Sequence, residues 1–274
     1  MKKLSIIIPV WNSKTVDKAI ASIPQSEEIE VLVIDGKSDQ YTIDLIDQVK
    51  DRIDYFVSEK DNGLYDAMNK GIKKASGEWV FTLASDDQLL CDPISIINKY
   101  ENQGSDLICG TIVAKDFYDR YFVMNPDNNL SRLDIDCSVF HPGTFFKRFL
   151  YDKYGMYDLQ YRCAADHEYF VRLYRNSVKF LCVPELITFF AYGGISTNNL
   201  YLAYREDIKI SDRYLVSKWK SRGFFIFRSL RHHIVKTVNR LGIRRINDRL
   251  MDRSGIKKLL LQHPEVVNTG FIGS

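Results

Sequence analysis

Apolar runs and polar breaks alternate along the first hundred residues. Apolar runs rich in β-branched residues predict strands buried on both faces of a sheet. Four such strands are expected: Ser5–Val10, Glu30–Ile34, Ile53–Val57 and Trp79–Leu83. Apolar residues at helical spacing predict helices over Thr42–Val49 and from Gly63 to Gly77. Alternation of strand and helix favours an α/β fold with a parallel, doubly wound sheet.

After residue 100 the pattern is less regular, which predicts strands in a mixed or antiparallel role. Four are expected: Leu107–Val113, Tyr118–Met124, Phe180–Val183 and Ile187–Ala191. A further helix is expected over Ala164–Arg175, and charged helices follow from about Tyr201. This organisation predicts one domain over residues 1–200 and a basic helical C-terminal extension over residues 201–274.

Composition narrows the class of protein. Of 274 residues, 45% are apolar and 27% charged, as in ordinary soluble domains, and a net charge of +3 gives no reason to expect a nucleic acid partner. The apolar run Leu4–Val10 is too short for a secretory signal, and no stretch approaches the roughly 18 apolar residues of a membrane span. Five cysteines without a C-x-x-C pair favour free thiols in a reducing cytoplasm.

Polar residues follow the predicted strands at the end of the sheet where ligands of doubly wound folds bind. Asp86 and Asp87 follow Trp79–Leu83. Two adjacent carboxylates there either hold Mg²⁺ or Mn²⁺ against a diphosphate or form a surface turn or helix cap. Asp35 either accepts hydrogen bonds from a base or ribose or closes a turn with Gly36.

The helix after Ala164 carries two acids in different settings. Asp166 shares the apolar face of the helix with Tyr169. A carboxylate on that face requires either an interaction partner or a functional role. It acts either as a general base for a hydroxyl group or in capping the helix near Ala164. Glu168 lies far round the helix with Arg172 four residues on, which predicts a solvated ion pair.

Two further features leave alternatives open. His141 either contacts a ligand or is a hydrogen-bonded core histidine. The Gly193-Gly194 turn either brings backbone N–H groups to a phosphate or is a plain loop. The sequence has no P-loop, dinucleotide-binding glycine motif, H-E-x-x-H or G-x-S-x-G, which disfavours P-loop phosphate chemistry and zinc proteolysis.

Taken together, the segments resemble the inverting family 2 glycosyltransferases of the type that builds bacterial surface polysaccharides. The segments that carry the resemblance, in the family's order, are SIIIPVWN from Ser5, VLVIDGKSDQYT from Val31, SEKDNGLYDAMNKGI from Ser58, GEWVFTLASDD from Gly77, HPGTFF from His141, AADHEYFVRL from Ala164 and GGIST from Gly193. They span about the first two hundred residues. The resemblance implies a GT-A fold, a Rossmann-like nucleotide-binding mixed sheet flanked by helices, here with a helical C-terminal extension.

The resemblance assigns roles on the donor side of the site. The implied nucleotide- and donor-binding residues are Pro9, Val10, Trp11, Asn12, Asp35, Ser38, Asp66, Asn69, Ser85 and Asp86. Among them, Asp35 would contact the nucleobase, and the stretch from Pro9 to Asn12 would line its pocket. Asp66 and Asn69 would face the donor.

The resemblance also implies a metal site and a base. Asp86 matches the last acid of the family's D-x-D motif and, with Asp87, would hold the divalent ion, Mn²⁺ or Mg²⁺. Asp166 matches the catalytic base. His141 and the Gly193-Gly194 turn would shape the donor and acceptor pocket. The sequence departs from the family pattern at Ala84, the first position of D-x-D, at Ala165, before the base, and at Met68, where an arginine is often found.

The implied reaction is one inverting displacement. A sugar would pass from a nucleotide diphosphate sugar, with UDP the commonest nucleotide, to an acceptor hydroxyl of a saccharide or lipid-linked saccharide in the cytoplasm. Two alternatives stay open: a non-catalytic relative that binds nucleotide sugars, and a nucleotidyltransferase. Basic residues outnumber acidic ones between Arg222 and Arg253. This segment is therefore expected either to contact the inner face of a membrane or to pack on the domain, where it could form an oligomer interface.

Overall fold

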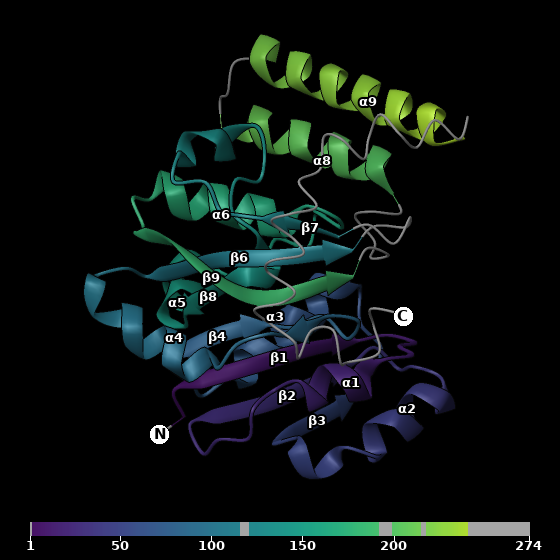
Figure 1. The fold of residues 1–274 in the computed structure, drawn as a ribbon, viewed down its shortest axis with the longest axis vertical. Helices are drawn as coiled ribbons and strands as arrows, with labels where there is room; N and C mark the ends of the chain where they lie inside the picture. The colour runs from purple at the N-terminus through teal and green to yellow at the C-terminus, as the bar shows by residue number, and fades with distance from the viewer. Residues whose placement is uncertain (1, 116–120, 192–198, 215–217, 241–274) are drawn as a thin grey trace.

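A computed structural model of the chain describes residues 2–115, 121–191, 199–214 and 218–240. In these ranges one mixed sheet carries helices on both faces, and a pair of stacked helices lies at one end of the molecule (Figure 1). The strand order is β3-β2-β1-β4-β8-β6-β9-β5, with β7 beside β6.

The first half of the sheet is parallel, which confirms the doubly wound prediction. β2 (Ile29–Asp35) lies between β1 (Leu4–Val10) and β3 (Tyr55–Ser58), and β4 (Trp79–Thr82) pairs with the other side of β1. Because parallel strands run in one direction, their carboxyl ends share one edge. The loops that follow β1, β2 and β4 therefore begin side by side.

The second half of the sheet is mixed. β8 (Thr144–Lys147) is antiparallel to both β4 and β6 (Leu107–Lys115), whereas β9 (Phe180–Ala191) is parallel to β6. β5 (Gln88–Leu89) and β7 (Tyr121–Met124) pair antiparallel with β9 and β6.

The two short strands expected before residue 192 were a wrong prediction, since they form one strand. The polar break at Pro184 and Glu185 suggested an interruption. Pairing with β6 instead continues across it, through shifts of register near Thr111.

Each face of the sheet has its own hydrophobic core. Side chains of β1 alternate between them: Ile6 and Ile8 pack on one face, Ile7 on the other. The first face is covered by α1 (Val16–Ala21), α2 (Gln40–Asp47) and α4 (Pro93–Tyr100). The second is covered by α3 (Leu64–Lys74), α5 (Phe149–Tyr154) and α6 (Ala165–Arg175). Short 3₁₀ turns complete the connections: η1 (Lys50–Arg52), η2 (Glu101–Gln103), η3 (Leu130–Asp134) and η4 (His141–Gly143).

Gly77 has a different role from the one expected. α3 ends at Lys74, three residues earlier. A Cβ atom at Gly77 would lie 2.7 Å from the backbone nitrogen of Ser5, so close packing against β1 requires glycine there.

The helices expected after Tyr201 are present as α8 (Leu200–Arg213) and α9 (Lys218–Arg240). They lie one above the other beyond α6, at the end of the molecule opposite β3 (Figure 1). In the described part of the chain, no helix is both long and apolar enough to cross a membrane.

Candidate functional site

Three loops are tied together at the carboxyl edge of β1, β2 and β4. The Asn12 backbone N–H donates to Ser38 Oγ at 2.7 Å, and Asn12 Oδ1 accepts from the Asp39 N–H at 2.9 Å. The hydroxyls of Ser13 and Thr15 donate to the Ser85 carbonyl at 3.2 and 3.0 Å. The structure thus brings together Asn12, Ser38 and Ser85, three residues of the predicted donor-binding set.

The other predicted residues of β1 and β2 are mostly enclosed. Asp35 is fully buried and its Oδ2 accepts from the Ser58 hydroxyl at 2.5 Å and from the Ser38 N–H at 3.1 Å. Pro9 and Val10 are buried in β1. Trp11 is 71% exposed at the same edge, which leaves its ring open to a ligand.

The two carboxylates after β4 lie in surroundings that disfavour their charge. Asp87 is 1% exposed; its Oδ1 accepts the Ala191 N–H at 3.0 Å, whereas its Oδ2 has no hydrogen-bond partner among the described residues. Burial raises the pKa of Asp86. Burial, reinforced by the charge of Asp86, raises the pKa of Asp87 well above its ordinary value.

This pair fits a divalent ion shared with a ligand. In the described ranges no group of three or more histidine, cysteine or acidic side chains is placed to hold a metal. Mg²⁺ and similar ions are often held by one or two carboxylates together with substrate phosphates, so a full protein cage is not required. The unpartnered Asp87 oxygen is the kind of buried acceptor that such an ion would satisfy.

Asp166 reaches the same edge of the sheet through Tyr65. The Tyr65 hydroxyl donates to Asp166 Oδ1 at 2.8 Å, across 101 residues of sequence. Tyr65 lies in the first turn of α3, which begins where the chain leaves the carboxyl end of β3. Burial and the Asp166 charge raise the pKa of Tyr65 well above its ordinary value, so its phenol keeps its proton and donates.

Tyr65 was missed at the level of sequence, although it stands in the segment from Ser58 that carries the resemblance. Its neighbour Asp66 was singled out instead. Asp66 accepts from the Asn62 backbone N–H at 2.9 Å and lies 3.8 Å from the Lys70 ammonium, so its described contacts are local.

An aromatic cluster packs against Tyr65, the partner of Asp166. His141 Nε2 lies 2.6 Å from the Tyr157 hydroxyl, and the Tyr157 and Tyr65 rings pack with centroids 5.6 Å apart. Asn69 exchanges two hydrogen bonds with the Tyr157 backbone, at 2.9 and 3.0 Å. Burial lowers the pKa of His141, which favours its neutral form. His141 and Asn69 are both buried, so in this structure they position Tyr157 and Tyr65; Gly193 and Gly194 lie outside the described residues.

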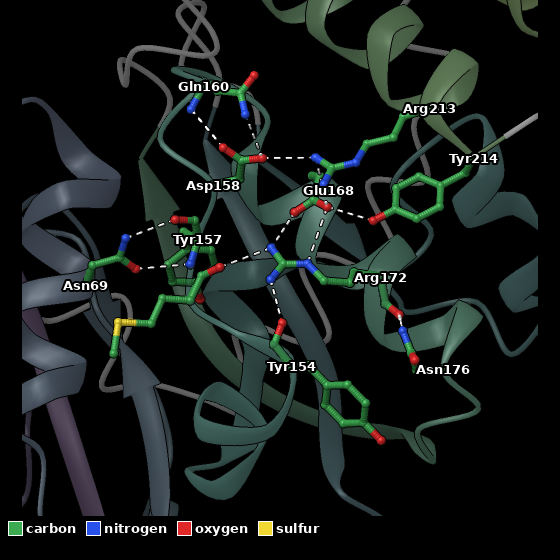
Figure 2. A network of polar contacts seen from close by, with 11 residues as sticks. Asn69, Tyr154, Tyr157, Asp158, Gln160, Glu168, Arg172, Asn176, Arg213 and Tyr214 are labelled. Atoms are coloured by element: carbon green, nitrogen blue, oxygen red, sulfur yellow. Dashed lines mark hydrogen bonds and ion pairs between the residues drawn. The ribbon is translucent and has the colours of Figure 1, made fainter.

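The solvated ion pair expected for Glu168 and Arg172 is wrong. Glu168 is fully buried, and Figure 2 shows its carboxylate enclosed by Arg172, Arg213 and Tyr214. The Tyr214 hydroxyl donates to Glu168 at 2.7 Å, and Arg172 also donates to the Tyr154 carbonyl at 2.8 Å. The end of α8 covers this side of α6, and spacing along α6 alone could not reveal that cover.

Comparisons with known proteins show the family and the fold. The family model described as glycosyl transferase family 2 matches residues 5–171. The PGL/p-HBAD biosynthesis glycosyltransferase of Mycobacterium bovis (strain BCG / Pasteur 1173P2) is 29% identical over 205 residues, 71% of this chain and 76% of that protein. The GalNAc(5)-diNAcBac-PP-undecaprenol beta-1,3-glucosyltransferase of Campylobacter jejuni is 30% identical over 163 residues, 54% of this chain and 52% of that protein.

Two solved structures share the fold. S. aureus TarS 1-349 in complex with UDP-GlcNAc has a TM-score of 0.61 at 16% identity, over 76% of this chain and 64% of that one. The mannosyltransferase PcManGT from Pyrobaculum calidifontis, in complex with GDP-Man and Mn²⁺, has a TM-score of 0.59 at 15% identity, over 78% and 64%. The match therefore spans just under two thirds of each of these chains, and at these identities it confirms the GT-A fold alone.

Proposed function

This chain belongs to glycosyl transferase family 2, and we propose that it transfers a sugar from a UDP-sugar to a hydroxyl group of a lipid-linked saccharide, with inversion at the anomeric carbon. The proposal is supported by one observation, the hydrogen bond from Tyr65 to Asp166. Tyr65 lies in the first turn of α3, which follows β3, a strand parallel to those whose loops bear Asn12, Ser38 and Ser85.

Asp166 is the general base in this proposal. Its carboxylate takes the proton of the acceptor hydroxyl, which attacks the anomeric carbon from the side opposite the diphosphate. Tyr65 fixes the orientation of the carboxylate through the hydrogen bond to Oδ1, since its phenol stays protonated. Neutral His141 and the tyrosines around it close the back of the site to water.

Asp86 and Asp87 provide the metal site in this proposal. A divalent ion bound there would neutralise charge that develops on the leaving diphosphate. The raised pKa of both carboxylates means that they ionise fully only at higher pH or when a cation is bound. Ala84, at the first position of D-x-D, leaves these two residues as the acids of this loop.

The donor site can be tested by thermal unfolding with a panel of UDP-, GDP- and dTDP-sugars, with and without Mn²⁺. A ligand that binds only the folded state at a hundred times its Kd adds about 2.7 kcal/mol to the free energy of unfolding. We expect stabilisation by UDP-sugars that depends on Mn²⁺. A panel without any response would contradict the donor assignment, and binding without any transfer or release of UDP would favour the non-catalytic relative.

The lipid-linked acceptor is supported by α9 as well as by the undecaprenol-linked substrate in the name of the Campylobacter relative. The apolar side chains along one side of α9 are between 58% and 91% exposed: Trp219, Ile226, Phe227, Leu230 and Ile234. The same helix contains several lysines and arginines but no acidic residue. An exposed apolar stripe on a basic helix suits an anionic membrane surface, and the free cysteines fit its cytoplasmic side.

Co-sedimentation with vesicles tests the membrane contact. We expect the protein to bind vesicles of phosphatidylglycerol and phosphatidylcholine, but not phosphatidylcholine alone, and Leu230→Glu/Ile234→Glu to abolish binding. Phe56→Glu is the matched control, because this exposed side chain lies on β3 at the opposite end of the molecule. If the double variant still binds, the membrane assignment is wrong; if it instead splits a dimer, α9 is an oligomer interface.

A further inference from the structure

The start of α6 is held by a carboxylate from a distant helix. Glu206 of α8 is 3% exposed and accepts three consecutive backbone N–H groups. The N–H of Arg162 donates to Oε1 at 2.9 Å, and the N–H groups of Cys163 and Ala164 donate to Oε2 at 2.8 and 3.0 Å. Both oxygens of the carboxylate are therefore used as acceptors.

This contact holds the backbone that leads into α6. Ala164 is the N-cap residue and has no side chain that can accept a hydrogen bond from the first turn. Glu206 binds the N–H of Ala164 and of the two residues before it, and its negative charge is favoured near that end by the helix dipole. Because Glu206 supplies the charge from outside, Asp166 in the first turn is left to contact Tyr65.

The neighbouring residue of α8 forms a second contact with the same turn. His167 Nδ1 lies 2.8 Å from Asp207 Oδ1, and His167 Nε2 lies 2.8 Å from the Leu133 carbonyl oxygen. Both partners are acceptors, so both ring nitrogens carry protons, in line with the raised pKa of His167, which the hydrogen bond and charge of Asp207 maintain against burial. Glu206 and Asp207 thus contact the chain on either side of Asp166 in sequence, Glu206 just before α6 and Asp207 at His167 in its first turn.

We propose that Glu206 is a positioning residue for the base Asp166: its carboxylate fixes the first turn of α6 so that Asp166 and Tyr65 meet in the productive geometry. This inference rests on the proposed role of Asp166. It extends the site beyond residue 171, where the family model ends, to a helix of the C-terminal extension. The extension therefore has a role in turnover that is separate from membrane contact.

Glutamine at position 206 tests whether the effect of Glu206 comes from the charge and acceptor geometry of its carboxylate or only from the volume of its side chain. Glu206→Gln keeps the size of the side chain but turns one acceptor oxygen into an NH₂ group that faces a backbone N–H. One or more of the three N–H groups then loses its partner, and the turn shifts to relieve the clash. Small displacements of a catalytic group lower turnover strongly, with about 10²-fold for 1 Å.

The experiment measures kcat and KM for UDP release, with water as the acceptor, using the UDP-sugar that gives the largest thermal shift. Glu206→Gln is expected to lower kcat roughly tenfold and to leave KM for the donor within about twofold, because the donor loops lie on other elements. Glu206→Asp, which keeps the charge, should recover part of the loss. Should Glu206→Gln not fold, Glu206→Asp carries the same test.

The matched control is Asp92→Ala, which removes the carboxylate that caps α4 through the Ile94 N–H at 3.1 Å. It is expected to lower the midpoint of thermal unfolding by about 2–4 °C without changing kcat. If kcat falls in proportion to the loss of stability in both Glu206→Gln and Asp92→Ala, the inference is overturned.

A double-mutant cycle with Asp166→Asn separates positioning from general damage. If Glu206 acts through Asp166, Glu206→Gln should change the residual rate of Asp166→Asn by less than about twofold. A full tenfold loss in that background would overturn the inference, as would a wild-type rate for Glu206→Gln alone. An unchanged rate for Asp166→Asn itself would instead contradict the proposed function.

Discussion

The parallel half of the sheet and the half built around β6, β9 and α6 hold the side chains of the proposed site in different ways. On the parallel side, Asn12, Ser38 and Ser85 follow strand ends directly and are tied to one another by loop hydrogen bonds. On the other side, Asp166 accepts a hydrogen bond from Tyr65 of α3, and the backbone that leads into its helix is held by Glu206 of α8. The proposed donor side is thus assembled from loops that directly follow parallel strands, and the proposed base side from side chains on three helices, α3, α6 and α8.

The two sides also treat buried charge differently. Asp87 is buried beside Asp86 and one of its oxygens has no hydrogen-bond partner in the described ranges. Glu168 is equally buried, but Arg172 and Tyr214 satisfy it. Since buried carboxylates need compensation, the first arrangement fits a site completed by a cation, whereas the second is a self-sufficient part of the scaffold.

The largest expected effect concerns the scaffold. Glu168→Ala leaves the half-buried Arg172 guanidinium without its ion-pair partner, and removal of one member of such a pair typically lowers the free energy of unfolding by about 3–5 kcal/mol. Chemical denaturation measures it. Asp152→Ala is the control, because its ion pair with Arg148 is exposed and worth roughly 0–1 kcal/mol. If the two variants lower the free energy of unfolding equally, the buried ion pair of Glu168 contributes no more to stability than an exposed surface pair.

The next effect concerns the base. Asp166→Asn is expected to lower kcat roughly 10²-fold or more, with donor-induced thermal stabilisation nearly unchanged, because an amide cannot accept the acceptor proton. UDP release and the thermal shift are measured on the same preparation. Asp152→Asn on α5 serves as the control. Near-normal turnover would show that Asp166 is not the general base, and the contacts around it would then have no role in catalysis.

A smaller effect is expected at Tyr65. Tyr65→Phe removes the hydrogen bond to Asp166 Oδ1 and keeps the ring. Hydrogen bonds to charged groups contribute about 1.5–3 kcal/mol, so a loss of roughly tenfold in kcat is expected. Tyr151→Phe is the matched control, because its buried hydroxyl lies 3.1 Å from the Tyr157 hydroxyl. If both variants lose activity equally, the aromatic cluster matters as a whole and the Tyr65 contact has no special role.

The difference between the two sides explains how far the sequence could be interpreted. The parallel strands were predictable because strands buried on both faces leave continuous apolar runs, and the loops after them stand next to those runs in the sequence. The residues that meet there were assigned to the donor through the resemblance, and they stand in the loops that follow these strands. The metal site at Asp86 and Asp87 remains a prediction.

The sequence did not reveal the proposed base side where its contacts come from other helices. The position of Asp166 on an apolar helix face was visible, but its partner Tyr65 on α3 and the contact of Glu206 with the backbone before α6 were not. Glu168 was placed in solvent because helical spacing describes only the helix itself, and α8 supplies the cover. Asn69 was assigned to the donor through resemblance, whereas the structure shows its amide bound to the Tyr157 backbone.

The smallest effect is the pH dependence of stability on the donor side. The pKa of Asp87 lies above its ordinary value of 3.8 in the folded state, so the folded protein holds this proton to higher pH than the unfolded chain does. Stability therefore falls as pH rises from about 4 to the folded pKa, by at most about 1.4 kcal/mol per pH unit. Asp87→Asn removes this dependence, so in the absence of metal its stability relative to wild type should increase as pH rises.

Unfolding by denaturant between pH 4 and 8 in a chelating buffer measures this difference. Addition of Mn²⁺ and UDP near neutral pH should reverse the order, because the wild type alone keeps the second carboxylate and gains the energy of binding. A wild type that becomes relatively more stable as pH rises, without metal, would mean that Asp87 has a partner in the folded protein. Its carboxylate would then be compensated as Glu168 is, and the two sides of the site would not differ in the treatment of buried charge.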